Sequence, residues 1–183
     1  MFPYISELNT LVALGTIALQ GVILLTVLNH VVYKWAVLSQ CIARWGLHVA
    51  FATAFFAMFM SLFYSEVVGY APCSLCWWGR IFTYPQVVIY GMGIYLNDAR
   101  AALYGIALSG LGVVVSLYHY YIEMGGAQII PCSSEAAGGV SCARVYVQEF
   151  GYVTFSMMAL TVFVFLIVIM TLYYRTHTQP TVG

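Results

Sequence analysis

Two cysteine pairs stand out in this chain, and the first has the pattern of a reactive dithiol. Cys73 and Cys76 are three residues apart in the stretch APCSLCWWGR. Pro72 predicts that a helix begins near Ser74, which puts Cys76 in the first turn, where the positive end of the helix dipole favours a thiolate. Arg80 follows Cys76 by four residues and shares its helical face. Both effects predict a lowered thiol pKa on Cys76 and a disulfide that exchanges readily.

The second pair, Cys132 and Cys142, lies in a long segment rich in glycine and serine, residues 124–149. Such a loop can present a disulfide to a soluble partner. Other interpretations remain open, because either pair could form a structural disulfide, and the four cysteines together match the ligand set of a four-thiolate zinc site. Covalent haem is disfavoured, because Trp77 rather than a histidine follows Cys76.

The composition is that of a membrane protein. Hydrophobic residues make up 63% of the chain and charged residues 7%, whereas a soluble domain carries about 25% charge. Five apolar segments reach the roughly 20 residues that cross a bilayer, where a lipid-facing backbone must be helical. They span residues 8–33, 46–68, 77–96, 101–123 and 149–174. The sequence therefore predicts an all-α membrane protein, and the net charge of zero gives no indication of a nucleic-acid partner.

The basic residues predict the orientation in the membrane. Alternate loops lie on the same side, which separates the lysine and arginine residues into two groups. The larger group is Lys34, Arg44, Arg100 and Arg175, and the smaller is Arg80 and Arg144. The positive-inside rule makes the side of the larger group cytoplasmic. The N-terminus and both cysteine pairs are then extracytoplasmic, where disulfides persist, so we expect two disulfide couples, no metal, and Cys41 as an unpaired cytoplasmic thiol. The first segment is too long for a cleavable signal peptide and lacks its basic n-region.

Several other polar residues have two readings. His119 lies in SLYHYYIE near the outer end of the fourth segment. It is a candidate contact for a quinone or a proton, or a member of an interfacial aromatic cluster. His30 and His48 flank the inner loop and could pair on a haem, but histidine is readily tolerated at that interface. Glu66 and Glu123 lie near outer helix ends, where solvation is enough to explain them.

The order of these motifs resembles the DsbB family of disulfide bond formation membrane proteins, especially its shorter BdbC-like branch, from about Leu47 to Tyr174. That family places P-C-x-x-C-W-x-x-R after a transmembrane helix, then a tyrosine–histidine cluster, a loop with two cysteines and a last helix. Here the matching stretches are PCSLCWWGR, SLYHYYIE, the loop at 124–149 and FGYVTFSMMALTVF. Vitamin K epoxide reductases use the same chemistry, but their loop cysteines precede the membrane CxxC, so the order here favours DsbB.

The resemblance implies a four-helix bundle, here with one extra N-terminal transmembrane helix. It also implies electron flow from a secreted thioredoxin-like (DsbA-like) oxidase to a membrane quinone, either ubiquinone or menaquinone. By similarity, Cys132 and Cys142 oxidise the partner, and Cys73 and Cys76 reoxidise the loop pair. Cys76 would face the quinone as a thiolate beside Arg80.

The expected organisation has three parts. The extra helix and a cytoplasmic loop occupy 1–45, a DsbB-like domain with two extracytoplasmic cysteine loops occupies 46–175, and a cytoplasmic tail occupies 176–183. The predicted function is that of a thiol:quinone oxidoreductase in the bacterial inner or plasma membrane. The competing class is a non-enzymatic accessory or assembly subunit of a membrane complex, whose disulfides are structural. The extra helix and the ten-residue spacing of the loop cysteines keep this alternative open.

Overall fold

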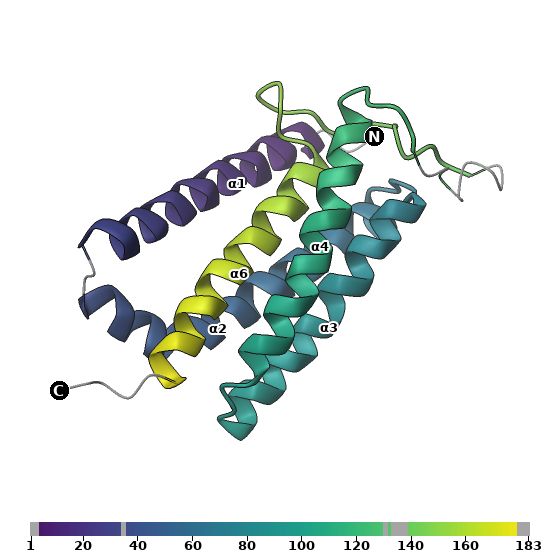
Figure 1. The fold of residues 1–183 in the computed structure, drawn as a ribbon. Coiled ribbons are helices and arrows are strands. Elements are labelled where there is room, and N and C mark those ends of the chain that lie inside the picture. The colour runs from purple at the N-terminus through teal and green to yellow at the C-terminus, as the bar shows by residue number, and fades with distance from the viewer. Residues whose placement is uncertain (1–3, 34–35, 130–131, 133–138, 179–183) are drawn as a thin grey trace.

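The computed structural model describes residues 4–33, 36–129, 132 and 139–178, and it is built from long helices (Figure 1). The α-helices are α1 Ile5–Leu28, α2 Ala36–Leu62, α3 Ser74–Leu96, α4 Ala101–Glu123 and α6 Phe155–Thr178. Two short π-helical segments, η1 Asn29–Tyr33 and η2 Phe63–Val67, extend α1 and α2. The predicted all-α class is confirmed.

Four of the helices form a closed bundle. In this bundle α2 packs against α3 and α6, and α4 packs against the same two helices, so each helix has two neighbours. The first helix, α1, lies outside this ring and packs against α6 (Figure 1). The expected architecture, a four-helix bundle plus one N-terminal helix, is therefore present.

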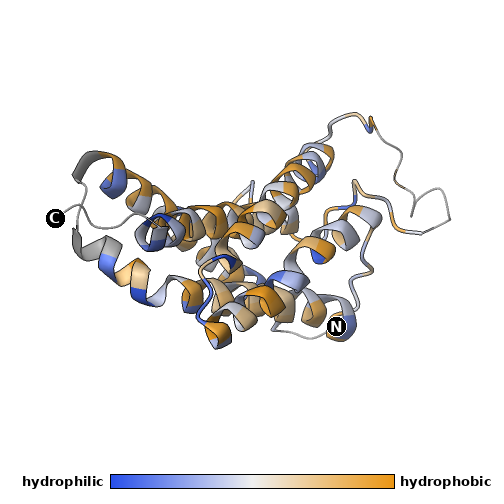
Figure 2. Cartoon of the chain, turned by 60° about the horizontal axis from the view of Figure 1, so that its bottom comes forward, coloured by the Kyte–Doolittle hydropathy of each residue, from blue (hydrophilic) through white to orange (hydrophobic). Residues whose placement is uncertain are grey.

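Four described helical segments have the length and hydropathy to cross a membrane. They are Ile5–Val31, Gln40–Val67, Ala101–Glu123 and Phe155–Thr178. The remaining long helix, α3, has 23 residues, which is enough length, but it carries Arg80 and Gln86, which are buried inside the bundle. Hydrophobic residues run along the outer faces of the helices (Figure 2). An apolar outer surface of this extent indicates that the helices are surrounded by lipid.

The boundary of the second helix differs from the prediction. The apolar segment was predicted to begin at residue 46, but α2 already begins at Ala36, so Arg44 lies in a helix rather than in a loop. The added turns are mostly apolar, but Ser39, Gln40 and Arg44 interrupt the hydrophobic run, so the prediction placed this stretch in the loop. Lys34 lies outside the described residues.

The last helix is shifted toward the C-terminus. Residues 149–154 form a tight turn, in which the backbones of Glu149 and Val153 exchange two hydrogen bonds of 3.0 Å. The helix α6 therefore begins at Phe155 rather than at residue 149, and it ends at Thr178, inside the predicted tail. Residues 179–183 of that tail lie outside the described residues.

Close contacts fix the positions of α3, α4 and α6. At Gly112 of α4, an added Cβ atom would lie 2.5 Å from the ring of Phe163 on α6, so this contact requires glycine. The Oε1 atom of the buried Gln86 accepts hydrogen bonds from the hydroxyl of Tyr90 at 2.8 Å and from that of Ser109 at 3.2 Å. Because Ser109 lies on α4, the second bond ties α3 to α4. These two helices carry most of the candidate site.

The chain ends and loops divide between the two ends of the bundle. The starts of α1, α3 and α6 lie at one end with the end of α4, and the α3–α4 turn and the end of α6 lie at the other (Figure 1). Both cysteine pairs therefore belong to the N-terminal end of the bundle. Cys41, near the start of α2, belongs to the opposite half.

Candidate active site

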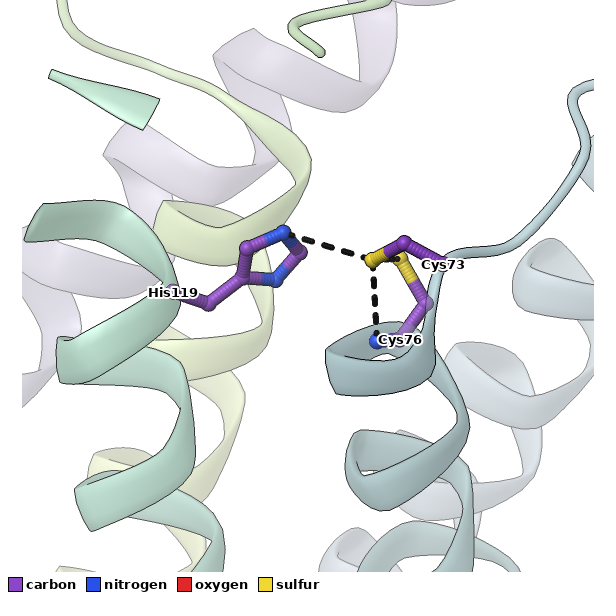
Figure 3. A group of neighbouring side chains, drawn as sticks. All are labelled: Cys73, Cys76 and His119. Carbon is purple, nitrogen blue, oxygen red and sulfur yellow. Dashed lines mark hydrogen bonds between the residues drawn. The ribbon is translucent and has the colours of Figure 1, made fainter. Parts of the chain in front are cut away.

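The CxxC pair opens α3. Cys73 is the N-cap residue, with extended backbone angles (φ −78°, ψ 175°), and its sulfur accepts a hydrogen bond of 3.3 Å from the backbone N–H of Cys76. The two Sγ atoms are 3.0 Å apart, and both cysteines are thiols (Figure 3). The predicted helix start near Ser74 is confirmed. A movement of about 1 Å would close the disulfide, since a sulfur–sulfur bond is about 2 Å long.

Cys73, rather than Cys76, is the sulfur that its surroundings stabilise as a thiolate. Hydrogen bonds from Cys76 and from His119, whose Nε2 atom lies 3.7 Å from the Cys73 sulfur, lower the pKa of Cys73 to about 4, against the opposing effect of burial. The prediction that Cys76 carries the thiolate is therefore corrected. It rested on the helix dipole and Arg80, whereas the imidazole of α4 faces Cys73 (Figure 3).

The guanidinium of Arg80 bonds to α2. Its Nε donates to the hydroxyl of Ser61 at 3.0 Å, and a terminal nitrogen donates to the carbonyl of Ser61 at 3.1 Å. The guanidinium carbon also lies 5.2 Å from the ring centre of Trp77, within the range of a cation–π contact. Arg80 therefore anchors α3 to α2, which is a different role from activating the Cys76 thiol.

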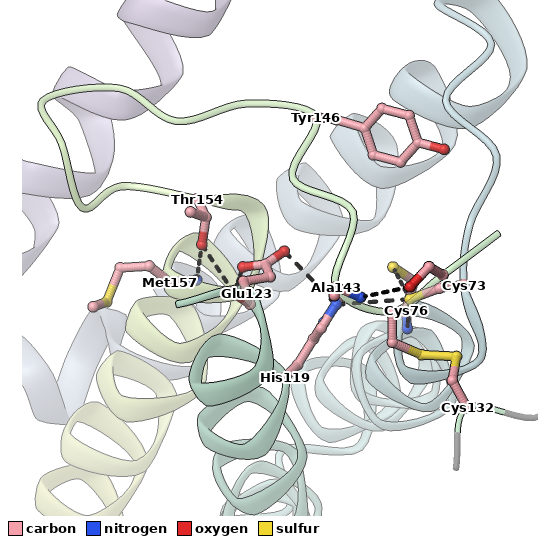
Figure 4. A network of polar contacts seen from close by, with 12 residues as sticks. Cys73, Cys76, His119, Glu123, Cys132, Ala143, Tyr146, Thr154 and Met157 are labelled. Carbon is pink, nitrogen blue, oxygen red and sulfur yellow. Dashed lines mark hydrogen bonds and ion pairs between the residues drawn. A yellow bond between two sulfur atoms is a disulfide. The ribbon is translucent and has the colours of Figure 1, made fainter. Parts of the chain in front are cut away.

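Glu123 is a site residue that the sequence reading missed. Its side chain is only 5% exposed, and its Oε1 atom lies 3.7 Å from Nε2 of His119. The hydroxyl of Ser156 donates to its other oxygen, and Ser156 is hydrogen-bonded at 2.9 Å to Thr154 (Figure 4). A chain of polar groups thus runs from α6 through Glu123 and His119 to Cys73. The i,i+4 spacing of His119 and Glu123 was the signal available in the sequence.

The loop pair forms a disulfide against the CxxC pair. Cys132 and Cys142 are bonded to each other and are 7% and 1% exposed. They form one buried cluster with Cys73, and Cys76 packs against it (Figure 4). The ring of His119 also makes a hydrogen bond to the backbone of Cys142. The two cysteine pairs are therefore neighbours, as thiol–disulfide exchange between them requires.

Tyr146 attaches the loop to the segment that precedes the CxxC pair. Its hydroxyl donates to the carbonyl of Ala71 at 3.1 Å, and its ring stacks on Tyr70 with centres 4.7 Å apart. The guanidinium of Arg144 lies 4.9 Å from the same ring. These contacts hold the second half of the loop beside the start of α3.

The structure bears on the zinc interpretation. A four-thiolate site is not formed, because Cys132 and Cys142 are bonded to each other. Among the described residues, one group of possible metal ligands remains, namely Cys73, Cys76 and His119, whose ligand atoms lie within 4.8 Å of one another. Such a group could supply three metal ligands, and the same atoms are those that thiol–disulfide exchange would use.

A cavity of about 730 Å³ adjoins Cys76, Arg80 and His119. This volume is within the range of small-molecule sites, about 300–1,000 Å³. Most of the remaining wall is apolar. The exception that matters is Tyr84, which lines the cavity and whose buried hydroxyl has no hydrogen-bond partner among the described residues. An unpartnered buried hydroxyl is costly, so this donor would bond to an oxygen atom of a ligand that reached it.

Comparisons with known proteins decide the family. A family model described as "Disulfide bond formation protein DsbB" matches residues 43–174, more than half of the chain. The chain belongs to the DsbB family. A probable disulfide formation protein of Oceanobacillus iheyensis is 43% identical over 129 residues, which cover 67% of this chain and 83% of the relative. Disulfide bond formation protein C of Bacillus subtilis is 35% identical over 128 residues, which cover 69% of this chain and 90% of the relative. No solved structure matches.

Membership of the DsbB family indicates the general function of the chain. The chain is a bacterial membrane protein of a family that forms disulfide bonds, which indicates oxidoreductase activity. In this DsbB-family chain the predicted site residues come together at one end of the bundle, with the CxxC pair, the loop pair and His119 in contact and Arg80 in the adjoining cavity wall. The match begins at residue 43, so α1 lies outside the part that the family shares.

Proposed function

We propose that the protein is a membrane thiol:quinone oxidoreductase that reoxidises a secreted, thioredoxin-like disulfide oxidase and passes the electrons to a membrane quinone. The observation that carries the proposal is the position of the dithiol. Cys73 is in one cluster with the loop disulfide, whereas Cys76 lines the cavity. The pair can therefore exchange with a disulfide on one side and transfer electrons to a bound molecule on the other.

The residues of the cavity fit a quinone, which combines ring oxygens with an apolar tail. The unpartnered hydroxyl of Tyr84 can donate a hydrogen bond to a ring oxygen, and Arg80 supplies a positive charge in the same wall. The apolar remainder suits the tail. A bound quinone supplies an acceptor for two electrons and two protons. Ubiquinone and menaquinone both meet this description.

Electron flow starts at the loop disulfide. A thiolate of the partner attacks one sulfur of the Cys132–Cys142 bond, and the second thiol of the partner then displaces that sulfur. The partner leaves as a disulfide, and the loop pair holds two thiols. Because both loop sulfurs are buried, at 7% and 1% exposure, binding of the partner must first expose one of them.

The CxxC pair then reoxidises the loop pair. For this step the CxxC pair is in its disulfide form: a loop thiolate attacks Cys73, its neighbour in the buried cluster, and Cys76 leaves as a thiolate. The second loop thiol then displaces Cys73, so the exchange ends with a loop disulfide and a CxxC dithiol. His119 stabilises the Cys73 thiolate and is placed to carry its proton toward Glu123. The CxxC dithiol returns to a disulfide when it transfers two electrons and two protons to the acceptor in the cavity. Per cycle, two partner thiols are oxidised and one acceptor gains two electrons.

On this proposal the cysteine end of the bundle faces the extracytoplasmic side. The partner is secreted, and disulfides persist in that compartment. Arg100, in the α3–α4 turn, and Arg175, near the end of α6, belong to the opposite end of the bundle. The positive-inside rule makes that end cytoplasmic.

Turnover of a soluble quinone analogue tests the proposal. Purified protein in detergent is mixed with a reduced thioredoxin-like dithiol protein, and reduction of the quinone is followed by its absorbance. Cys76→Ser should abolish turnover, whereas Cys41→Ser should retain it, because Cys41 is an exposed, unpaired thiol on α2. Undiminished turnover in Cys76→Ser contradicts the mechanism. If the Cys132–Cys142 disulfide resists mild reductant, as counted by mass spectrometry, a structural role in an accessory subunit is favoured.

A further inference from the structure

The helix α1 lies outside the family match, yet it forms part of the cavity wall. The α1 residues that line the cavity are Leu8, Leu11, Val12, Gly15, Thr16 and Leu19. Their spacing, i, i+3, i+4, i+7, i+8 and i+11, places them on one face of the helix, over about three turns. We call these six residues the α1 stripe.

The α1 stripe is apolar and leaves open space. Thr16 carries its one side-chain polar group, and that hydroxyl donates to the carbonyl of Val12 in the same helix at 2.9 Å. At Gly15 an added Cβ atom would meet no atom within 4 Å. The cavity therefore reaches the helix backbone at Gly15, and the stripe offers a ligand only apolar contacts.

Polar contacts near both ends of the stripe hold α1 in place. Near its start, the side-chain oxygen of the buried Asn9 accepts a hydrogen bond of 2.8 Å from the hydroxyl of Tyr64. After it, Gln20 donates to the hydroxyl of Thr161 at 3.1 Å and accepts from the hydroxyl of Tyr152 at 3.2 Å. These bonds reach η2, α6 and the loop before α6. The extra helix is therefore a fixed wall of the cavity.

We propose that α1 binds the tail of the membrane quinone and thereby selects which quinones the protein accepts. The inference rests on the proposed function, because that function names the occupant. The polar groups of the cavity that suit a quinone ring, on Cys76, Arg80 and Tyr84, all lie on α3, and the α1 stripe supplies an apolar surface on a separate helix. An isoprenoid tail is apolar and makes no hydrogen bonds, so burying it against such a stripe is favourable.

Photo-crosslinking with the full-length protein in lipid nanodiscs tests this proposal without relying on turnover. The probe is a quinone with a photoreactive diazirine in its tail, and labelled peptides are identified by mass spectrometry. We expect label within residues 8–19 and competition by the same quinone without the diazirine. Label confined to other helices, or label on α1 that unlabelled quinone does not displace, as for a site that binds lipid acyl chains, overturns the proposal.

A matched pair of glycine variants gives a second readout. Gly15→Leu should fill the space at the stripe, reduce the labelling, and raise KM for a long-tailed quinone about tenfold, the factor expected when about two methylene groups lose their contacts. KM for a tail-less quinone with the same ring should not change. Gly21→Leu is the control, because Gly21 also has nothing within 4 Å of an added Cβ atom but does not line the cavity.

The outcomes separate this inference from the proposed function. If the unaltered protein reduces no quinone, with or without a tail, the proposed function fails. If it reduces both kinds with equal KM, and Gly15→Leu alters neither labelling nor KM, the function stands and the role of α1 is rejected. Gel filtration and thermal unfolding show whether Gly15→Leu is folded, and the labelling of the unaltered protein decides the question if it is not.

Discussion

The Nε2 atom of His119 lies 3.7 Å from the sulfur of Cys73, and this contact joins the last turns of α4 to the N-cap of α3. An imidazole in this position stabilises the thiolate, and hence the reduced form of the CxxC pair. A dithiol that is stabilised in this way makes its disulfide a stronger oxidant. The contact therefore links the packing of two helices to the redox potential of the site.

Removal of this imidazole should lower the reduction potential of the Cys73–Cys76 couple. In His119→Ala, each unit by which the pKa of Cys73 rises should make the potential about 30 mV more negative, since one unit corresponds to about 1.4 kcal/mol. Equilibration with dithiothreitol buffers, followed by thiol counting, measures the potential. His48→Ala is the control, because His48 is exposed on α2. An unchanged potential in His119→Ala contradicts the prediction.

Reduced protein should hold one thiolate well below neutral pH. The pKa of Cys73 is lowered from 9.0 to about 4, chiefly by the hydrogen bond from Cys76 and then by that from His119. Thiolate absorbance at 240 nm should therefore fall as the pH falls through about 4, and Cys73→Ser should remove this transition. Because the pKa is depressed by folding, its contribution to the stability of the reduced protein is complete above pH 9 and is lost as the pH falls through 4. A single transition near pH 9 would refute this assignment.

Loss of the Glu123 carboxylate should slow turnover and alter its pH profile. Glu123→Gln keeps the shape of the side chain but removes the charge that faces His119, and we expect a rate about a hundredfold lower, at the lower edge of what positioned acid–base groups contribute. A purely structural role would leave the shape of the pH profile unchanged. The matched control is Glu66→Gln, because Glu66 is exposed, and its profile should be that of the unaltered protein.

The hydroxyl of Tyr84 should contribute to quinone affinity. Tyr84→Phe removes a donor that has no partner in the described protein, so folding stability should be retained. We expect KM for the quinone to rise about twofold to tenfold, the range of one net hydrogen bond. The control is Tyr95→Phe on the same helix, where the side chain is 81% exposed. Equal KM values for the two variants would show that Tyr84 does not contact the quinone.

Close packing between α4 and α6 should make stability sensitive to substitution of Gly112. Gly112→Ala places a methyl group 2.5 Å from the ring of Phe163, and such overpacking costs about 1–3 kcal/mol. Gly110→Ala is the control on the same helix, since its added Cβ atom meets nothing within 4 Å. Thermal unfolding in detergent should show a lower midpoint for Gly112→Ala alone. Equal unfolding midpoints for the two variants would mean that α4 and α6 accommodate the methyl group at position 112 without loss of stability.

Local patterns in the sequence predicted the helices and the CxxC pair correctly. Apolar runs of sufficient length indicate membrane helices, and Pro72 predicts the start of α3 near Ser74, because proline marks a helix boundary. The early start of α2 at Ala36 escaped prediction, because Ser39, Gln40 and Arg44 interrupt the apolar run and suggest a loop. The late start of α6 follows from the turn at residues 149–154, which an apolar window does not resolve.

The arrangement around the sulfur atoms depended on contacts that the sequence does not display. The carboxylate of Glu123 accepts a hydrogen bond from Ser156, which comes from a different helix. The thiolate falls on Cys73 because of a histidine 46 positions away in the chain. The position of α1 beside the cavity was equally hidden, because its apolar residues have the pattern of an ordinary membrane helix.

The burial of the loop disulfide protects it from reduction by small thiols. Cys132 and Cys142 are 7% and 1% exposed, so a small thiol that diffuses past the bundle does not reach this disulfide, because exchange depends on access. Access to this disulfide therefore requires a partner whose binding opens the buried cluster. Under the proposed function, respiratory carriers are thereby shielded from futile cycling, and oxidising capacity is reserved for newly exported proteins.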